Sequence, residues 1–269
     1  NTWVQKADFG GMTRASAVGF AMSGKGYVGT GHDDNGNYTQ DFWEYYPGTD
    51  SWVQLNDFPG APRVRAVGFS IAGKGYIGTG ADNSGKMKDF WEYSPTTDSW
   101  TQKADFGGMA RNSAVGFGIG NKGYIGTGTD DSFNSKQDFW EYDPVSDNWI
   151  QRADFGGVAR NSAVGFAIGN KGYIGTGIDG SSNVKQDFWE YTPNSSYQLT
   201  VTPNGSTTWD HRNWETYGND VANTNSGNVG IGTNTPLNKL SVAGDAGFYG
   251  NVGVAVSYTH LTLPTNGCV

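Results

Sequence analysis

The sequence predicts an all-β protein made of four copies of one four-stranded module. Two observations carry this prediction. Aromatic and arginine positions recur with a period of about 49 residues, and apolar residues occur in short runs between Gly, Asn, Asp and Ser clusters. The 269 residues include 42 Gly, about twice the usual share, and 36% hydrophobic residues, enough for a packed core. We therefore expect many short strands and no long helix.

The repeat is defined by positions at which the four copies agree. Each copy has a Trp that opens its last strand, an Arg, a Tyr inside K-G-Y-[IV]-G-T-G and a Trp inside F-W-E-Y, and insertions amount to a single residue. The positions are Trp3, Trp52, Trp100 and Trp149; Arg14, Arg63, Arg111 and Arg160; Tyr27, Tyr76, Tyr124 and Tyr173; Trp43, Trp91, Trp140 and Trp189. One folding unit is thus used four times.

Each module contains four strand-like segments in a fixed order: A-V-G-F-x-[IM], K-G-Y-[IV]-G-T-G, then D-F-W-E-Y, then a strand that opens at the repeated Trp, as in 148–155. A tight hairpin joins the first two, because Gly-Lys-Gly or Asn-Lys-Gly supplies the positive φ of a short turn. Such a sheet cannot bury both faces alone, so successive sheets should stack around an axis as blades of a β-propeller. The Gly-rich second strand is expected at the inner position, near the axis.

The modules resemble the kelch family. Tyr142-Asp143-Pro144, Trp149, Arg160 and Tyr173 follow the family's Y-D-P, W, R and Y-x-x-G-G order. The resemblance covers residues 1–193. It departs from the family where the glycine doublet becomes Gly-Thr-Gly, as at 29–31, which makes that strand end atypical.

The resemblance also bears on the number of blades. Kelch propellers commonly have more than four, which implies further modules before Asn1. Two segments compete to complete the last sheet: Asn1 to Asp8, an orphan fourth strand, could pair with Gln186 to Tyr191, or Tyr197 to Val201 could fill the same place.

Positions repeated in all four copies are expected to be scaffold, because equivalent places on a ring seldom all bind one ligand. The repeated Arg and the Glu of F-W-E-Y should satisfy backbone carbonyls or each other at blade contacts. Catalysis by this pair is the less favoured alternative. Eight of the ten Trp belong to the modules, which favours packing between blades over stacking on sugar rings. The four Glu are Glu44, Glu92, Glu141 and Glu190.

The copies differ most in the loops after each Gly-Thr-Gly, which start at His32, Ala81, Thr129 and Ile178. Loops on one rim of a propeller form a shared surface, so ligand specificity is expected there. No cofactor is predicted; bound Ca²⁺ is the alternative, but an EF-hand spacing is missing and Asp, Asn and Gly are ordinary turn residues. The candidate binding residues are Asp33, Asp34, Asn35, Asp82, Asn83, Asp130, Asp131 and Asp179.

Composition argues against several functional classes. The formal net charge is −8 with both signs interspersed, so no basic stripe is available for nucleic acid. No apolar run reaches the roughly 18 to 20 residues of a membrane span. The three His, at 32, 211 and 260, share no ligand spacing, and Cys268 is the single Cys, so no nucleophile and base pair emerges. Copper-radical chemistry, known on kelch propellers, would need a Tyr–Cys pair within the modules. We therefore predict no enzymatic activity.

The remaining chain has three predicted parts. Residues 194–226 are rich in Asn, Thr, Ser and Gly and are predicted to be a linker or degenerate region. Residues 227–255 resemble the segments that lead into trimeric tail-fibre and adhesin stalks, on Asn228 to Thr233 and Lys239 to Val242, which implies a homotrimer. Residues 256–269 begin with V-S-Y-T-H-L-T-L-P-T, which resembles a sequencing adapter translated in one frame.

These observations together predict a binding or adhesion scaffold. It would recognise a protein or glycan through its variable loops and belong to a secreted or surface-attached protein of a bacterium or phage, since stalks of this kind stand on surfaces. Two alternatives stay open: an accessory propeller of an enzyme whose catalytic domain lies outside this chain, and a structural spacer.

Overall fold

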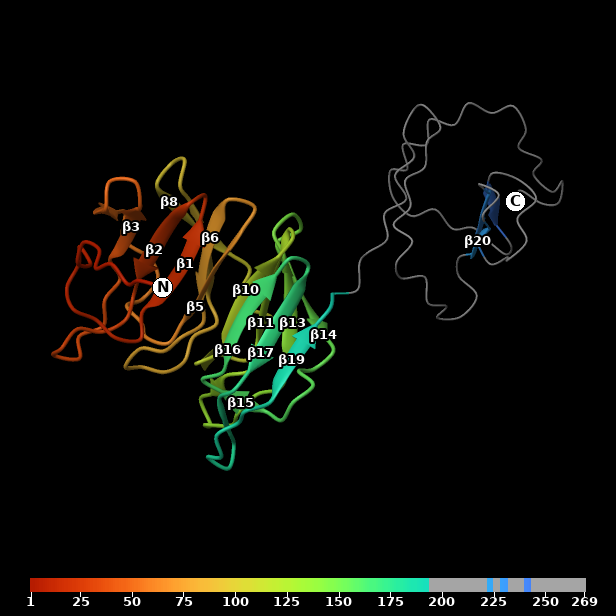
Figure 1. The fold of residues 1–269 in the computed structure, drawn as a ribbon. Coiled ribbons are helices and arrows are strands. Elements are labelled where there is room, and N and C mark those ends of the chain that lie inside the picture. Colours follow the sequence, from red (N-terminus) through yellow and green to blue (C-terminus); the bar gives the residue numbers. More distant parts are fainter. Residues whose placement is uncertain (194–221, 225–227, 232–239, 243–269) are drawn as a thin grey trace. The chain divides into compact units, whose positions relative to one another are not determined.

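The computed structural model describes residues 1–193 and, beyond them, the backbone of three short strands (Figure 1). The chain divides into two units, with the boundary between Ser195 and Ser196, and each unit is described here by itself. The predicted linker at 194–226, stalk at 227–255 and adapter-like end at 256–269 lie almost wholly outside the described residues.

The first unit consists of antiparallel sheets stacked as the four blades of a propeller, so the predicted fold class is confirmed. The described residues contain no helix, and therefore none that could cross a membrane. In each blade the strands pair in chain order. Blade 1 has β1 (Val18–Met22), β2 (Lys25–Gly29), β3 (Phe42–Tyr46) and β4 (Ser51–Leu55); blade 2 has β5 (Val67–Ile71), β6 (Lys74–Gly78), β7 (Phe90–Ser94) and β8 (Ser99–Lys103); blade 3 has β10 (Val115–Ile119), β11 (Lys122–Gly126), β13 (Phe139–Asp143) and β14 (Asn148–Arg152).

Blade 4 has three strands among the described residues: β16 (Val164–Ile168), β17 (Lys171–Gly175) and β19 (Phe188–Tyr191). Two further pairs of short strands lie at one end of blades 3 and 4. They are β9 (Arg111–Asn112) with β12 (Thr129–Asp130), and β15 (Arg160–Asn161) with β18 (Ile178–Asp179).

The first hairpin of each blade turns one residue earlier than the sequence predicts. In blade 1 the turn residues are Ser23 and Gly24, with φ of 52° and 78°, and Lys25 already belongs to β2. In blade 3, Gly120 supplies the positive φ at 57°. The Lys of Gly-Lys-Gly is therefore the first residue of a strand, because the two preceding residues suffice for the turn.

The inner strand is also different from the prediction. Strands β1, β5, β10 and β16 contact one another in sequence and form the inner edge of the blades, so the A-V-G-F strand lies innermost and K-G-Y-[IV]-G lies second. The reason is that the inner strand has glycine too. An ideal Cβ on Gly68 would lie 2.9 Å from the Cβ of Val18 in the preceding blade, so only glycine permits this approach.

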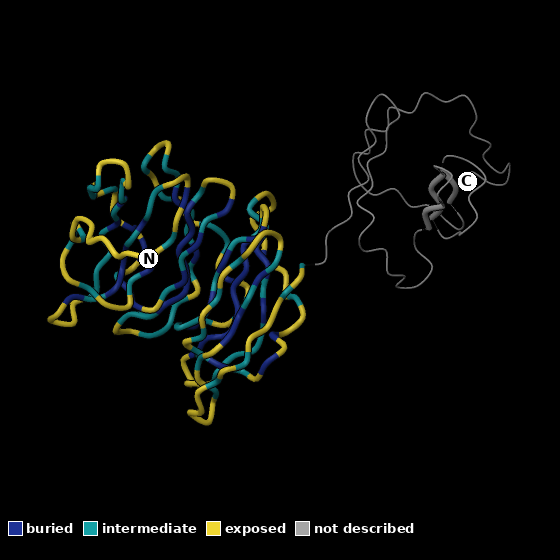
Figure 2. The backbone as a smooth tube through the Cα atoms, in the orientation of Figure 1, coloured by how far each residue is buried: buried dark blue, intermediate teal, exposed yellow. Residues whose placement is uncertain are grey.

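The hydrophobic core lies between successive blades (Figure 2). Val67, Phe69 and Ile71 of blade 2 pack against Tyr142 and Trp149 of blade 3, and equivalent clusters fill the other two junctions. Burial of each such side chain contributes about 1.5–3 kcal/mol. Stability is therefore shared among repeated junctions rather than held by one central core.

In the second unit, β20 (Ala222–Thr224) pairs antiparallel with β21 (Asn228–Ile231), and β21 pairs in parallel with β22 (Leu240–Val242). β21 and β22 fall within the segment that resembles a stalk, and β20 falls within the predicted linker. The stalk and the homotrimer it implies stay predictions.

Candidate binding rim

The variable loops all lie on the side of the blades where β15 is labelled in Figure 1. We call them rim loops 1 to 4: residues 32–38, 81–86, 129–135 and 178–184. In blades 1 and 2, single bridges from Ala15 to His32 and from Val64 to Ala81 hold the loop against the segment that precedes the inner strand. In blades 3 and 4 the short pairs β9–β12 and β15–β18 do the same. The scaffold thus fixes both ends of each loop.

The Gly-Thr-Gly segment starts each rim loop. In blade 2, Thr79 has a φ of 57° and Gly80 a φ of 93°, and the same pair of positive values recurs in every blade. The turn aims the N–H of Gly80 at the carbonyl of Arg111 in the next blade, at 2.8 Å. Gly31 binds Arg63 and Gly128 binds Arg160 at the same distance. The departure from the kelch glycine doublet therefore occurs at a junction between blades.

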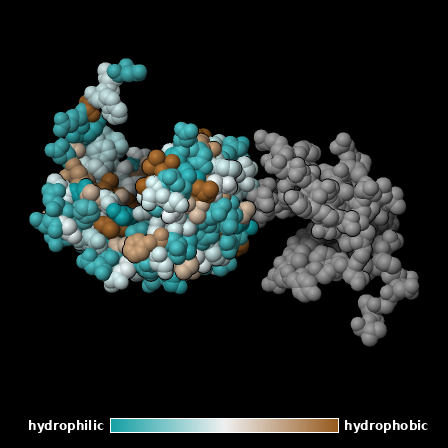
Figure 3. Space-filling view, turned by 90° about the horizontal axis from the view of Figure 1, so that it is seen from below, coloured by the Kyte–Doolittle hydropathy of each residue, from teal (hydrophilic) through white to brown (hydrophobic). Residues whose placement is uncertain are grey.

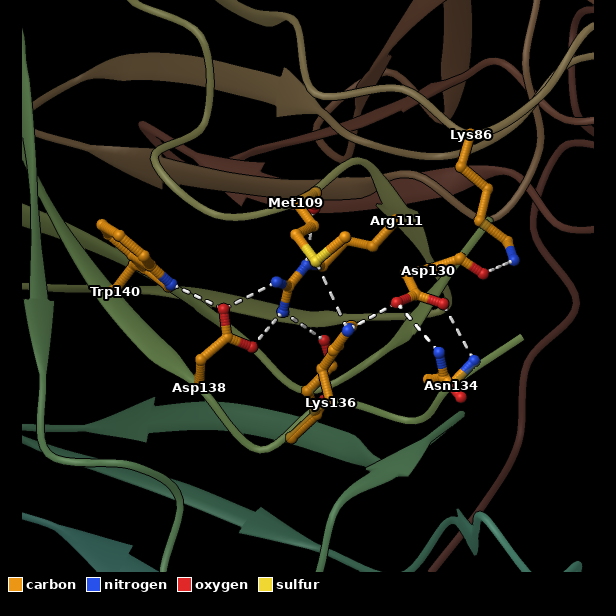
Figure 4. A network of polar contacts seen from close by, with 9 residues as sticks. Lys86, Met109, Arg111, Asp130, Asn134, Lys136, Asp138 and Trp140 are labelled. Atoms are coloured by element: carbon orange, nitrogen blue, oxygen red, sulfur yellow. Dashed lines mark hydrogen bonds and ion pairs between the residues drawn. The ribbon is translucent and has the colours of Figure 1, made fainter. Parts of the chain in front are cut away.

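Beneath each rim loop lies a buried arginine (Figure 4). In blade 3, Arg111 is fully buried and binds both carboxylate oxygens of Asp138 at 2.7 Å. It also donates to the carbonyls of Thr127 at 2.9 Å and Met109 at 3.0 Å, and the indole of Trp140 donates to Asp138. Such bidentate, charge-assisted pairs hold a fixed geometry. Arg63–Asp89 and Arg160–Asp187 repeat the bidentate contact, whereas Arg14 binds Asp41 through its Nη2 alone.

The partner of the arginine differs from the one expected. The repeated Arg does bind backbone carbonyls, but its charged partner is the Asp before F-W-E-Y and not the Glu within it. The Glu instead accepts a hydrogen bond from the repeated Tyr, at 2.7 Å between Tyr76 and Glu92 and 3.0 Å between Tyr124 and Glu141. Burial, together with that Glu, raises the pKa of these Tyr hydroxyls. Both groups are committed to the scaffold.

The Arg–Asp pairs make the stability of the fold depend on pH in the acidic range. Hydrogen bonds from Arg160 and then Trp189 lower the pKa of Asp187 from 3.8 to about 2. Burial alone would raise the pKa of Asp89 and of Asp138, but the arginine hydrogen bonds outweigh it and both pKa values are lowered. Because the folded state binds these protons less readily than the unfolded state, the contribution is complete above the unfolded pKa and is lost as the pH falls.

We therefore expect the Tm to be nearly constant above pH 5 and to fall steeply between about pH 4 and pH 2. Thermal unfolding followed by circular dichroism at a series of pH values measures this. Asp187→Asn should lower the Tm at pH 7. It should also make the fall of the Tm between pH 4 and pH 2 less steep. An unchanged Tm down to pH 2.5 would contradict the role of these pairs.

The carboxylate of the first Asp in each rim loop accepts hydrogen bonds from backbone N–H groups of the same loop. Asp33 accepts the N–H groups of Asn35 and Asn37, each at 2.8 Å, and Asp82 accepts Ser84 and Gly85 in the same way. These are Asx turns, which set the loop's shape.

In rim loops 3 and 4 a lysine joins this arrangement (Figure 4). Lys136 lies 2.5 Å from Asp130 and is the main cause that lowers the pKa of that carboxyl to about 2. Lys185 lies 2.6 Å from Asp179 and also lowers its pKa. The four leading Asp are therefore buried or partly buried turn residues rather than free ligands. Within residues 1–193, no group of three or more His, Cys, Asp and Glu is placed to hold a metal.

The other predicted residues, Asp34, Asn35, Asn83 and Asp131, are exposed. Asp34 accepts a hydrogen bond from Thr13 at 2.8 Å. Asp131 accepts the backbone N–H of Lys86 at 2.9 Å and so ties rim loop 3 to rim loop 2. No hydrogen bond between described residues joins rim loops 1 and 2. The structure thus joins rim loop 3 to rim loop 2 through Asp131, whereas no hydrogen bond between described residues joins the candidates of loops 1 and 4 to them.

Sequence reasoning missed two residues of this rim. Arg65 lies on an inner ladder in which each blade bonds the next: Arg65 N–H to Ser16 at 3.0 Å, then Ser113 N–H to Arg65 at 3.0 Å. Its side chain is exposed, and the other three copies have Ser at this position. Phe133 in rim loop 3 is 82% exposed, and Lys86 lies 4.4 Å above its ring. An alignment of the four modules would have found both, because each is present in one copy and absent from the other three.

Figure 3 views the molecule from the β15 side. Hydrophilic residues cover most of the visible face of the first unit, and hydrophobic ones form small separate patches. This surface suits a ligand bound by polar groups and an occasional aromatic side chain.

Comparisons with known proteins agree with the fold. No protein-family model and no curated protein matches the sequence. Chains of solved structures match it 233 times, so the fold itself is common and does not select a function. One is YjhT, with a TM-score of 0.55 and 18% identity over 70% of this chain and 68% of that chain. At that identity the likeness concerns architecture, and the architecture is that of a β-propeller.

Proposed function

We propose that this protein is a non-catalytic scaffold that binds a protein or glycan through rim loops 2 and 3 and the neighbouring Arg65. One observation carries the proposal. The four modules repeat their packing residues, yet this part of the rim has exposed groups that the other copies lack. Residues that pack the scaffold are repeated in every module. An exposed position that is not repeated has no such packing role and can bind a ligand.

The chemistry of this area is mixed. Arg65 and Lys86 supply positive charge, Asp131 and Asn83 supply hydrogen-bond acceptors, and Phe133 supplies an exposed ring. An aromatic ring beside amide, carboxylate and guanidinium groups can stack on one face of a sugar and bind its hydroxyls, or hold a polar loop of a protein.

The resemblance of residues 227–255 to surface stalks supports an extracellular setting and a role in adhesion.

The test is direct binding by the full chain. A glycan array and a display library of extracellular protein domains would be screened, and each hit measured by calorimetry with the single variants Phe133→Ala and Arg65→Ser. We expect each variant to weaken a true hit at least about tenfold, since anchor residues contribute about 1.4 kcal/mol or more. Arg65→Ser restores the residue found in the other blades, so the fold should tolerate it. Chelation of Ca²⁺ should not change the affinity, because the leading Asp oxygens already accept N–H groups.

Val145→Ala is the matched control, since Val145 is 92% exposed in the β13–β14 turn, away from the rim loops. Equal affinities for Phe133→Ala and this control would refute the site. If neither library gives a hit, the alternatives of an enzyme accessory module or a spacer gain weight, and the genes or domains flanking this chain would separate those two.

A further inference from the structure

Rim loops 1, 3 and 4 share one tight hairpin. In each, the N–H of the leading Asp donates to the carbonyl four residues on, at 3.0–3.1 Å, and the carbonyl of that Asp accepts the N–H three residues on, at 2.9–3.1 Å. The last residue of such a three-residue loop adopts the left-handed conformation, which glycine reaches most readily. That residue is Gly36 in loop 1 and Ser182 in loop 4, with φ of 80° and 64°. In loop 3 it is Phe133, with φ of 61°.

Phe133 therefore occupies this position at a cost in stability. In the left-handed conformation the Cβ comes too close to a backbone carbonyl oxygen, and bulky residues are rare there. The ring recovers little of that cost by burial, since Phe133 is 82% exposed among the described residues. Strain of this kind occurs at functional positions whose surroundings hold the residue in place.

The neighbouring blade holds Phe133 through one residue, Lys86. Its ammonium lies 4.4 Å from the centre of the Phe133 ring and also donates to the carbonyl of Asp130 (Figure 4). The backbone N–H of Lys86 donates to the carboxylate of Asp131 at 2.9 Å. At the equivalent position, which bridges to the first residue of each loop, the other modules have Tyr38, Ser135 and Val184. The cation at the ring is therefore specific to rim loops 2 and 3.

The charges in the contact network of Phe133 cancel. Lys136 lies 2.5 Å from the carboxylate of Asp130, and Lys86 binds that of Asp131 through its N–H. Two lysines thus accompany two carboxylates, and the network has no net charge that would attract a charged ligand. A cationic ligand is disfavoured further, because the ammonium of Lys86 already lies at the ring and would repel it.

The exposed side chains beside Phe133 all form hydrogen bonds. In rim loops 2 and 3 they are Asn83, Ser84, Asp131, Ser132 and Asn134. A protein partner usually buries an aromatic anchor among other apolar groups. A pyranose ring instead needs one aromatic face for its C–H groups, and donors and acceptors for its hydroxyls. The surroundings of Phe133 therefore suit a sugar better than an apolar patch of a protein.

We propose that Phe133 is a stacking platform for a neutral pyranose ring and that Lys86 is the residue that positions it. This inference rests on the proposed binding rim and narrows its ligand from protein or glycan to a neutral glycan. The sugar packs on the part of the ring that Lys86 leaves open, and Asn83 and Asp131 bind its hydroxyls. The hairpin and the cation fix the ring before the ligand arrives, so binding costs little side-chain entropy there.

A glycan array probed with the full chain tests the class of ligand. It carries neutral glucan, galactan and mannan oligosaccharides, acidic chains with sulfate or uronic acid, and cationic chitosan oligosaccharides. We expect hits among the neutral chains. Phe133→Ala should weaken them at least about tenfold, whereas Ser182→Ala, at the same hairpin position in loop 4, should keep them.

Several results would overturn the proposal: hits confined to charged chains, neutral hits that Phe133→Ala retains, or no glycan hit at all. A protein ligand whose binding Phe133→Ala abolishes would overturn the sugar assignment alone and leave the binding rim in place. Binding of any ligand that neither Phe133→Ala nor Arg65→Ser weakens would refute the rim itself.

A double-mutant cycle, measured by calorimetry on the strongest neutral oligosaccharide, tests the role of Lys86. Lys86→Met keeps an unbranched side chain and removes the charge, and should weaken binding about two- to fivefold. Lys86→Arg keeps the cation and should restore binding to within about twofold of the unmodified chain. In a Phe133→Ala background, Lys86→Met should have no further effect, because Lys86 acts through the ring. Equal losses in both backgrounds would overturn the positioning role.

The stability of Phe133→Gly separates ligand binding from folding. Glycine removes the left-handed strain, which costs more than the exposed contact with Lys86 returns, so the Tm should rise by about 1–4 °C while binding is lost. Ser182→Gly makes the same backbone change in loop 4 and should raise the Tm without affecting binding. A lower Tm for Phe133→Gly would show that the ring stabilises the loop, and the proposal would lose its basis in strain.

Discussion

Replacing Arg111 by methionine is expected to lower the free energy of unfolding by about 3–5 kcal/mol. The guanidinium is fully buried and holds both oxygens of Asp138, so its loss leaves a partly buried carboxylate without its counter-charge. It also leaves the carbonyls of Thr127 and Met109 without their donor. Urea unfolding followed by tryptophan fluorescence measures the change.

Two controls separate the missing charge from the lost volume. Arg111→Met combined with Asp138→Asn removes the orphaned carboxylate and should recover part of the loss. Arg65→Ser, which removes an exposed arginine, should change the free energy of unfolding by less than about 0.5 kcal/mol. A loss below about 1 kcal/mol for Arg111→Met would mean that water readily replaces the guanidinium, and the buried pairs would then contribute little.

The repeat made most of the fold predictable from sequence. Four copies of each Trp, Tyr and F-W-E-Y position fix four strands per module, and in each sheet the strands pair in chain order. The inner strand was assigned wrongly because glycines occur in both candidate strands. The choice depends on which strand edge meets the neighbouring blade, and that is a property of the stacked array rather than of one module.

The candidate site was less predictable. Asp33 and Asp130 have the residue type of a ligand-binding loop, but whether an Asx turn consumes the carboxylate depends on loop geometry that spacing alone does not give. The partner of Arg111 was missed for a similar reason. Asp138 and Glu141 both repeat in every module at nearly constant spacing from the arginine. What distinguishes them is their place, since Asp138 lies just before β13 and Glu141 lies within it. Arg65 was accessible to sequence reasoning, as the single copy that departs from Ser.

The repeated contacts between blades show how function can be added to this fold. Each junction repeats the same arginine, glycine and aromatic contacts, so a loop that begins and ends at a junction can change without disturbing it. The rim of blades 2 and 3 uses this freedom, with Arg65 and Phe133 as its clearest departures.

Gly123→Val should be strongly destabilising, because Gly123 lies at the junction between blades 2 and 3. A Cβ there would lie 2.7 Å from the ring of Phe69 and 3.0 Å from Ile71, and valine adds two further methyl groups to a packed interface. We expect a loss of about 3 kcal/mol in the free energy of unfolding. The control is Gly48→Val, at a position with no neighbouring atom within 4 Å. It should be close to neutral.

The shape of the transition is as informative as its midpoint. In a stacked array each blade is stabilised by its neighbours, so weakening the junction of blades 2 and 3 should divide the cooperative unit. Gly123→Val should therefore unfold over a wider range of urea than the unmodified chain, with a smaller m-value. A single transition with an unchanged m-value would show instead that the four blades unfold as one unit even when this junction is strained, because the remaining junctions then suffice to couple them.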